Sequence, residues 1–121
     1  MFINLSNHIS KDWDRAQIES AGRYGEIVDI GFPDVDPSGD SDYFDRLSNE
    51  YVAKIMAFGV RNLVVMVQGE FVFTYRVVMK LKALGIKCIA AETKRNVKED
   101  IDDNGQKVKI SNFKFEQFME Y

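Results

Sequence analysis

Short, mainly apolar runs alternate along the chain with segments in which apolar residues recur every three or four positions. The runs lie at 2–5, 26–30, 63–67 and 86–91. They predict strands, and the continuous run at 63–67, rich in β-branched residues, predicts a strand buried on both faces. The amphipathic segments predict helices, which begin at Asp12, at Asp40 or Ser41 and at Glu70 and end near Gly22, Gly59 and Gly85. This β-α-β-α-β-α-β order predicts an α/β fold: a single Rossmann-like domain with a mostly parallel sheet and helices on both faces.

The last quarter of the chain has a different pattern, in which apolar and charged residues alternate. Segments 97–101 and 107–115 flank an Asn104-Gly105 pair, which is a strong turn signal. We therefore expect a domain spanning 1–121 whose residues 96–121 form a terminal β-hairpin extension. Its aromatic end contains Ile110, Phe113, Phe115 and Phe118. Two interpretations stand: these residues pair two chains in a homodimer, or they complete the core of one chain.

Composition narrows the classes of function. The chain has 121 residues, 45% of them hydrophobic, which suffices for one core and is too short for two ordinary domains. Its 16 basic and 19 acidic residues give a formal charge of −3, which argues against binding to long nucleic acid. Cys88 is the single cysteine and lies in an apolar run, so we expect a buried, inert thiol. With no apolar run of membrane length, a cytoplasmic protein without a membrane partner is expected.

The candidate site lies where strands are expected to end. In an open α/β sheet the loops after the strands meet at the carboxyl edge, and the N–H groups of a following helix favour anions there. Four loops should converge at this edge: Ser6-Asn7-His8, Phe32-Pro33, Gln68-Gly69-Glu70 and Thr93-Lys94-Arg95. Gly69 permits a close backbone approach, and Lys94 and Arg95 supply positive charge for phosphates. Trp13, Phe32 and Phe71 are candidates for stacking on a base, with core packing favoured for Trp13.

Several of these residues have a structural interpretation of equal standing. His8 is a proton-transfer or phosphate-binding candidate, or a loop residue that binds only backbone. Glu70 is a ribose ligand or base, or simply complements the helix dipole. Lys94 and Arg95 bind phosphate or are solvated. The acidic residues between Asp34 and Asp45 fit no calcium loop, so loop and helix-capping roles are favoured for them.

Common motifs for other chemistries are missing from the sequence. It contains no GxGxxG, no GxxxxGK[ST], no GxSxG and no CxxC, and it has one histidine. Dinucleotide, nucleoside-triphosphate, serine-hydrolase and zinc sites lose support accordingly, and we expect neither a cofactor nor a metal.

Short segments carry a resemblance to a known group. Asn4-Leu5-Ser6-Asn7-His8, Trp13, Gln68-Gly69-Glu70 and Ala90-Ala91-Glu92-Thr93-Lys94-Arg95 resemble segments of the short ancillary proteins encoded beside type III CRISPR systems. That group is similar to CARF domains, which are Rossmann-like homodimers that bind a cyclic oligoadenylate messenger in antiviral defence. Some members are ring nucleases and others sequester the messenger. The resemblance implies a ligand-facing set of Ser6, Asn7, His8, Gln68, Gly69, Glu70, Thr93 and Arg95.

The resemblance also implies a metal-independent reaction. A ribose 2′-hydroxyl of the ligand would attack the adjacent phosphorus, with His8 as acid or base and Arg95 or Lys94 stabilising the developing charge. A sponge or sensor that binds without cleaving is the first alternative. An unrelated enzyme acting on small molecules such as nucleotides, and a structural subunit of a larger complex, are the others.

Overall fold

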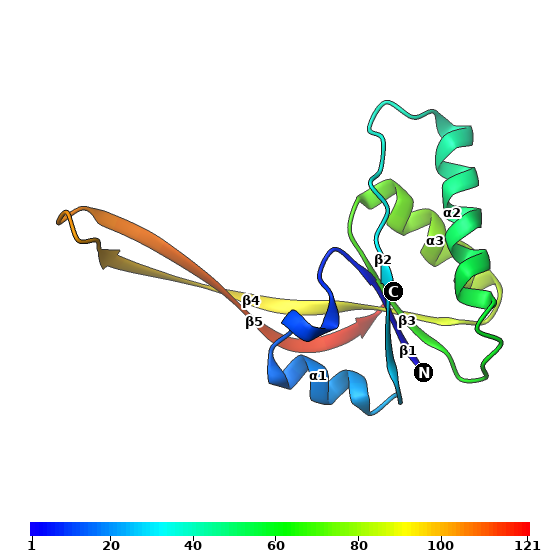
Figure 1. Ribbon diagram of the computed structural model, residues 1–121, viewed down its shortest axis with the longest axis horizontal. Helices are drawn as coiled ribbons and strands as arrows, with labels where there is room; N and C mark the ends of the chain where they lie inside the picture. Colours follow the sequence, from blue (N-terminus) through cyan, green and yellow to red (C-terminus); the bar gives the residue numbers. More distant parts are fainter.

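Four parallel strands and one antiparallel strand form a single sheet in the computed structural model, which describes residues 1–121 (Figure 1). This confirms the predicted α/β class with its C-terminal hairpin. In chain order the elements are β1 Phe2–Ser6, a 3₁₀ turn Ser10–Asp12, α1 Arg15–Gly22, β2 Ile27–Gly31, α2 Ser41–Met56, β3 Val64–Gln68, α3 Phe71–Ala83, β4 Lys87–Ile101 and β5 Lys107–Glu120.

The strand order β2-β1-β3-β4-β5 places β1 at the centre of the parallel part of the sheet. Phe2 in β1 pairs with Ile27 on one side and with Val64 on the other. The chain first builds outward from β1 to β2 and then crosses to β3, so the winding direction reverses between β1 and β3. Ligands in open α/β sheets bind beside the carboxyl ends of the strands at such a reversal.

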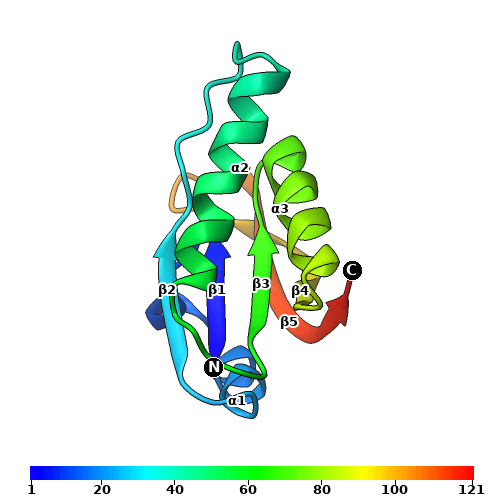
Figure 2. The ribbon, with the colours of Figure 1, turned by 90° about the vertical axis from the view of Figure 1, so that its right-hand side faces the viewer.

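Helices α2 and α3 cover one face of the sheet (Figure 2). Behind them lies the larger core, a cluster of twelve buried residues that includes Ile3, Val65, Ile55 and Phe73. Phe73 is fully buried, and its ring meets that of Tyr51 edge-on at 5.3 Å between centroids. On this side β1 and β3 contribute only apolar side chains, those of Ile3, Leu5, Val65 and Val67, so apolar packing closes this face.

The opposite face is covered by α1 alone, a helix of eight residues. Its core is a cluster of five buried residues that contains Phe2, Ala21 and Met66. The Trp13 ring meets Phe2 edge-on at 6.0 Å between centroids, which agrees with the packing role predicted for it. One short helix leaves part of this face uncovered at the carboxyl ends of the strands.

Beyond residue 92, β4 and β5 leave the sheet on the side of α1 as a long two-stranded ribbon (Figure 1). We call residues 94–114 the arm. The hairpin and its Asn104-Gly105 turn are confirmed, with Gly105 in the left-handed region at φ 78°. The predicted break at Thr93-Lys94-Arg95 is wrong, because 87–101 is one strand. These residues pair by backbone with Phe115, Lys114 and Phe113, so the strand continues through them whatever the polarity of their side chains.

Helix starts also differ in one place from the prediction. Helix α1 is capped by Asp14, whose side chain accepts from the Gln17 N–H, and Trp13 lies before it in extended backbone. Asp12 ends the 3₁₀ turn instead of capping the helix. Asp40 caps α2 by accepting from the Tyr43 N–H, as predicted. Asp36 and Asp45 bind Ser38 and Lys80, so hydrogen bonds of the fold occupy this acidic stretch.

Cys88 is buried in the larger core, as predicted, and its thiol donates to the Ile86 carbonyl oxygen. Burial raises the pKa of the Cys88 thiol to about 11, which keeps the thiol protonated at neutral pH. No helix combines the length and the apolar character that crossing a membrane requires.

Candidate functional site

A cavity of about 470 Å³ lies on the α1 face, beside the carboxyl ends of β1 and β3. It sits at the reversal of the winding direction, between the start of α1 and the base of the arm. Its walls hold polar residues of the predicted site and apolar residues of the sheet and hairpin. The residues of the cavity wall are Ser6, Asn7, His8, Asp12, Trp13, Asp14, Gln17, Met66, Gln68, Gly69, Ala91, Thr93, Phe113 and Phe115.

The loop after β1 is held by the carbonyl oxygen of His8. This oxygen accepts hydrogen bonds from Asn4 Nδ2 at 2.8 Å and from Trp13 Nε1 at 3.2 Å, and Ser6 Oγ lies 3.1 Å from it. These contacts fix the backbone of the loop and leave the imidazole of His8 exposed at the cavity. The backbone-binding and proton-transfer interpretations of His8 therefore concern different atoms and are compatible.

Asn4 is the buried centre of this network. It is 1% exposed, and its Nδ2 also donates to Asp29 Oδ1 at 2.7 Å while its Oδ1 accepts from Ser6 Oγ at 2.6 Å. Asp29 in turn accepts from the N–H and the hydroxyl of Ser10. A satisfied polar network inside a sheet rigidifies its surroundings, so β1, β2 and the loop hold Asn7 and His8 at the cavity.

Gln68 lines the cavity, but its side-chain amide is hydrogen-bonded to the backbone of β4. Its Nε2 donates to the Ala91 carbonyl oxygen at 3.3 Å, and its Oε1 accepts from the Ala91 N–H at 2.9 Å. The side chain thereby continues the β3 to β4 contact where the regular pairing has ended at Met66 and Ile89.

Gly69 lines the same wall, and its lack of a side chain accommodates Phe32. A Cβ atom at this position would overlap the Phe32 ring. Phe32 packs into the larger core, edge-on to Phe73 at 5.2 Å between centroids, so its ring lies on the face opposite the cavity. The close approach expected at Gly69 is thus made by a core aromatic ring.

Glu70 and Phe71 lie outside the cavity wall. The Glu70 carboxylate accepts from the N–H groups of Val72 and Phe73, both at 2.8 Å, so it caps α3. The N–H groups at the start of α3, which were expected to favour an anionic ligand, therefore bind the carboxylate of Glu70 instead. Phe71 is 89% exposed on the outer side of α3, away from the α1 face.

Of Thr93, Lys94 and Arg95, only Thr93 lines the cavity. Arg95 follows on the same face of β4, paired with the cavity residue Phe113, and its guanidinium donates to Ser111 Oγ at 2.9 Å. Lys94 points to the other face of the strand because side chains alternate. The structure thus gathers Ser6, Asn7, His8, Gln68, Gly69 and Thr93 at one cavity.

Sequence reasoning missed the apolar wall of the cavity. Met66 and Ala91 belong to β3 and β4, and Phe113 and Phe115 come from β5, beyond the hairpin turn. Asp14 joins the two parts, because its Oδ2 accepts from the Phe115 N–H at 3.2 Å. The alternation of Phe113 and Phe115 was the available signal, since it predicts that both rings share one face of a strand.

No lysine or arginine lines the cavity, whose charged residues are Asp12 and Asp14. Asp14 accepts from two backbone N–H groups, at Gln17 and Phe115, which offsets its charge. The cavity therefore suits an uncharged, flat group with hydrogen-bonding edges, and Trp13 and Phe113 are among the aromatic residues that line it. Anionic parts of a ligand would lie outside, toward Arg95.

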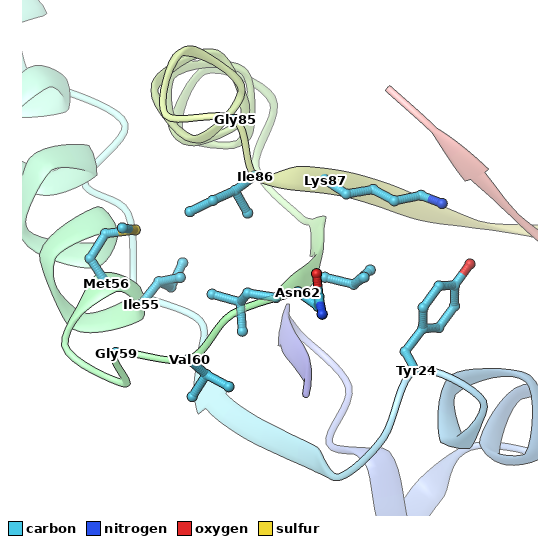
Figure 3. A pocket seen from close by; sticks show the side chains of 11 residues that line it. Tyr24, Ile55, Met56, Gly59, Val60, Asn62, Gly85, Ile86 and Lys87 are labelled. Atoms are coloured by element: carbon cyan, nitrogen blue, oxygen red, sulfur yellow. The ribbon is translucent and has the colours of Figure 1, made fainter.

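A second cavity, of about 640 Å³, lies at the opposite edge of the sheet (Figure 3). Met56, Ile55, Val60 and Ile86 make one side of it apolar, and Lys87 lies over the Tyr24 ring on the other. It adjoins the amino ends of the parallel strands, where the helices end, so it lacks the convergent loops of the carboxyl edge. We take the smaller cavity as the candidate site for that reason.

The fold and the site define a class: a Rossmann-like α/β domain with a ligand-sized cavity at its topological reversal and an antiparallel arm beside it. The chain belongs to the Uncharacterized protein MJ1673 family, which it matches over residues 1–119. That description carries no activity, so the resemblance to CRISPR ancillary proteins stays a prediction. Searches of curated proteins and of solved structures gave no match.

Proposed function

We propose that this protein binds a cyclic oligoadenylate messenger of CRISPR antiviral signalling at the α1-face cavity. The observation that carries the proposal is the cavity itself. Polar residues from the ends of β1 and β3 and from the middle of β4 line it, together with Trp13, which precedes α1, and the aromatic residues Phe113 and Phe115 of β5. Its volume of about 470 Å³ falls in the range of small-molecule sites. The resemblance of the surrounding segments to type III CRISPR ancillary proteins selects the ligand.

The cavity admits one nucleoside unit of such a ring. An adenine stacks between aromatic side chains such as Trp13 and Phe113, which accept any base face, and its amino edge donates to the Asp12 carboxylate. Asn7 and Thr93 then meet the ribose. The phosphates remain outside the carboxylate-bearing wall, and Arg95 on the adjacent stretch of β4 faces them.

Linearisation of the ring is the enzymatic form of this proposal. The attacking 2′-hydroxyl loses its proton as the new oxygen–phosphorus bond forms, and the departing 5′-oxygen gains a proton as its bond breaks. His8 is the predicted acid or base because its ring is exposed at the cavity while its backbone is fixed. Arg95 is the predicted stabiliser of the charged phosphorane oxygens.

The experiment combines binding and cleavage. Purified protein is incubated with cyclic tri-, tetra- and hexa-adenylate without added metal, while thermal stabilisation and linear products are followed. We expect stabilisation by at least one ring that AMP reproduces only at much higher concentration. Linear product identifies a ring nuclease, and intact ligand identifies a sponge or sensor. No stabilisation by any ring would refute the proposal and leave the cavity to another small molecule.

Variants locate the site. Asn7→Ala and Phe113→Ala alter exposed cavity residues, so we expect binding to weaken roughly tenfold, as for one lost hydrogen bond or stacking contact. Phe71→Ala is the matched control, because this exposed aromatic lies on the opposite face. If Phe71→Ala weakens binding and the cavity variants do not, the ligand binds elsewhere. Should cleavage occur, His8→Ala at unchanged turnover would remove His8 from the chemical step.

A further inference from the structure

The arm is an unsupported ribbon. Beyond the pairing of Met66 with Ile89, β4 has no neighbour on its β3 side, and β5 is the edge of the sheet throughout. Almost every residue from 92 to 114 is exposed. An isolated two-stranded hairpin is at best marginally stable in water, and unpaired strand edges invite pairing with another chain. We therefore expect another surface to pack against the arm.

The two faces of the arm differ in chemistry. One face continues the cavity wall and carries Arg95, Val97, Glu99 and Ile101 of β4; we call it the inner face. Opposite these residues on β5 lie Phe113, Ser111, Lys109 and Lys107 in that order. Val97, Phe113 and Ile101 are 50%, 62% and 66% exposed, so the apolar part of the inner face is largely in water.

The other face, the outer face, is built for solvent. Lys94 lies directly opposite Lys114 and Asn96 opposite Asn112, followed by Lys98 opposite Ile110. Two like charges at one cross-strand position repel each other unless water separates them. Neither Lys94 nor Lys114 forms an ion pair. The contrast between the faces identifies the inner face as the one that docks.

The inner face is complementary to itself. Arg95 and Glu99 lie two residues on either side of Val97, and on β5 Phe113 and Lys109 lie two residues on either side of Ser111. A two-fold axis through the Val97 and Ser111 pair, perpendicular to the strands, reverses this order in a second copy. Arg95 then faces Glu99 of the second copy, and Phe113 faces its Lys109, an ion pair and a cation–π pair, each made twice.

We propose that two copies of this chain dimerise arm to arm through their inner faces, antiparallel and centred on Val97. Such an interface is isologous, as a two-fold dimer requires. It covers Val97, Ile101 and Phe113 of both arms, leaves only Ile110 of the exposed large apolar residues in water on the outer face, and gives each ribbon a second layer, which a lone hairpin lacks. The α3 stripe of Phe71, Tyr75 and Met79 offers apolar surface without such paired charges.

The same register completes the cavity of each copy. Four residues from the axis, Ile101 and Lys107 of the second copy come opposite Thr93 and the buried Phe115, beside the cavity that these two residues line. Thr93 and Ile101 are eight residues apart, or about 27 Å along a strand, so the two cavities stay separate. Lys107 of the second copy thus brings a cation to a cavity that has none. This last step rests on the proposed function, whereas the dimer does not. In the dimer Arg95 is paired with Glu99, so Lys107 of the second copy takes the phosphate-facing role that Arg95 has in a single chain.

The test measures molar mass by light scattering and sedimentation without any ligand. The wild type should have twice the 13.9 kDa of one chain. Arg95→Glu and Glu99→Arg each oppose like charges at two places, and we expect either to weaken the dimer by roughly a hundredfold. The double exchange, Arg95→Glu with Glu99→Arg, should restore it. Lys94→Glu and Lys98→Glu on the outer face are matched controls that leave the dimer intact.

The outcomes separate the two proposals. A monomeric wild type, or a dimer that survives both single exchanges, would overturn the arm interface, and sensitivity to Phe71→Ala would move the contact to α3. Failure of the double exchange to restore the dimer would also overturn the predicted register. With the dimer established, Lys107→Ala should weaken binding of cyclic tetra-adenylate while leaving the mass unchanged. Unaltered binding would refute the composite cavity alone.

Discussion

The two faces of the sheet divide stability from recognition. The face under α2 and α3 is closed by a cluster of twelve buried residues, and the face under α1 by one of five. Around the smaller cluster the α1 face buries polar side chains, among them Asn4, Ser6 and Gln17. The surplus of apolar packing on one side stabilises the fold, which lets the other side hold hydrogen-bonding groups and a cavity.

The largest expected effect comes from the larger core. Phe73→Ala removes a fully buried ring that contacts Phe32 and Tyr51, so the free energy of unfolding should fall by about 3–5 kcal/mol. Denaturant titration measures this, with Phe71→Ala as the control on the same helix. The exposed Phe71 should change stability by less than about 0.5 kcal/mol. Equal losses in the two variants would contradict the assignment of the core.

A second variant tests whether the α1 face is organised by its polar network. Asn4→Ala leaves the His8 carbonyl and Asp29 short of a donor inside the structure, which should cost about 1–3 kcal/mol. It should also loosen the His8 loop, seen as faster amide exchange from 7 to 13. Asn7→Ala, an exposed neighbour of the same type, is the control for stability. A loss of stability without faster exchange would show that Asn4 does not hold the loop.

Gly69 connects the two faces, and its replacement shows which of them needs it. In Gly69→Ala the added methyl group overlaps the Phe32 ring and displaces it from the larger core, at a cost of about 1–3 kcal/mol. Gly31→Ala is the control, because nothing lies within 4 Å of its Cβ position. If Gly69→Ala instead keeps wild-type stability and loses ligand binding, the close approach belongs to the ligand.

The effect that is smallest at neutral pH is the dependence of stability on the ionisation of Cys88. Burial raises the pKa of the Cys88 thiol from 9.0 to about 11, so the unfolded thiol ionises first as pH rises. Below pH 9 both states keep the proton, and between pH 9 and 11 the folded state loses stability. Burial also raises the pKa of Tyr121, which acts in the same direction. Cys88→Ala should show a shallower decline above pH 9 by thermal melting; an identical decline would assign it to other groups.

Much of the fold followed from local pattern. The runs at 2–5 and 63–67 appear as β1 and β3, and the spacing from Tyr43 to Ile55 appears as α2, because periodicity reports which side of an element is buried. The hairpin turn followed from Asn104-Gly105. The strand through Thr93-Lys94-Arg95 did not, since its formation depends on backbone pairing with β5, and the polarity of side chains says nothing about that partner.

The candidate site was predictable only in part. Chain order alone placed the ends of β1 and β3 together, and so indicated Ser6, Asn7, His8, Gln68 and Gly69. The sequence could not tell which atoms of these residues are already used, as the amide of Gln68 is by Ala91. Nor could the sequence tell whether Glu70 caps α3 or binds a ligand, because both roles suit an acidic residue at the start of a helix.

The sequence by itself determined the strand and helix order, the carboxyl-edge loops and the buried thiol, because each depends on local periodicity or on chain order. Tertiary structure alone decided that Phe113 and Phe115 return to the cavity of Ser6 and His8, and that Phe32 fills the space above Gly69 on the opposite face. It also set the register that puts Arg95 and Glu99 symmetrically about Val97 on one face of the arm. These contacts join residues distant in sequence, and pairing across strands fixes them rather than any local preference.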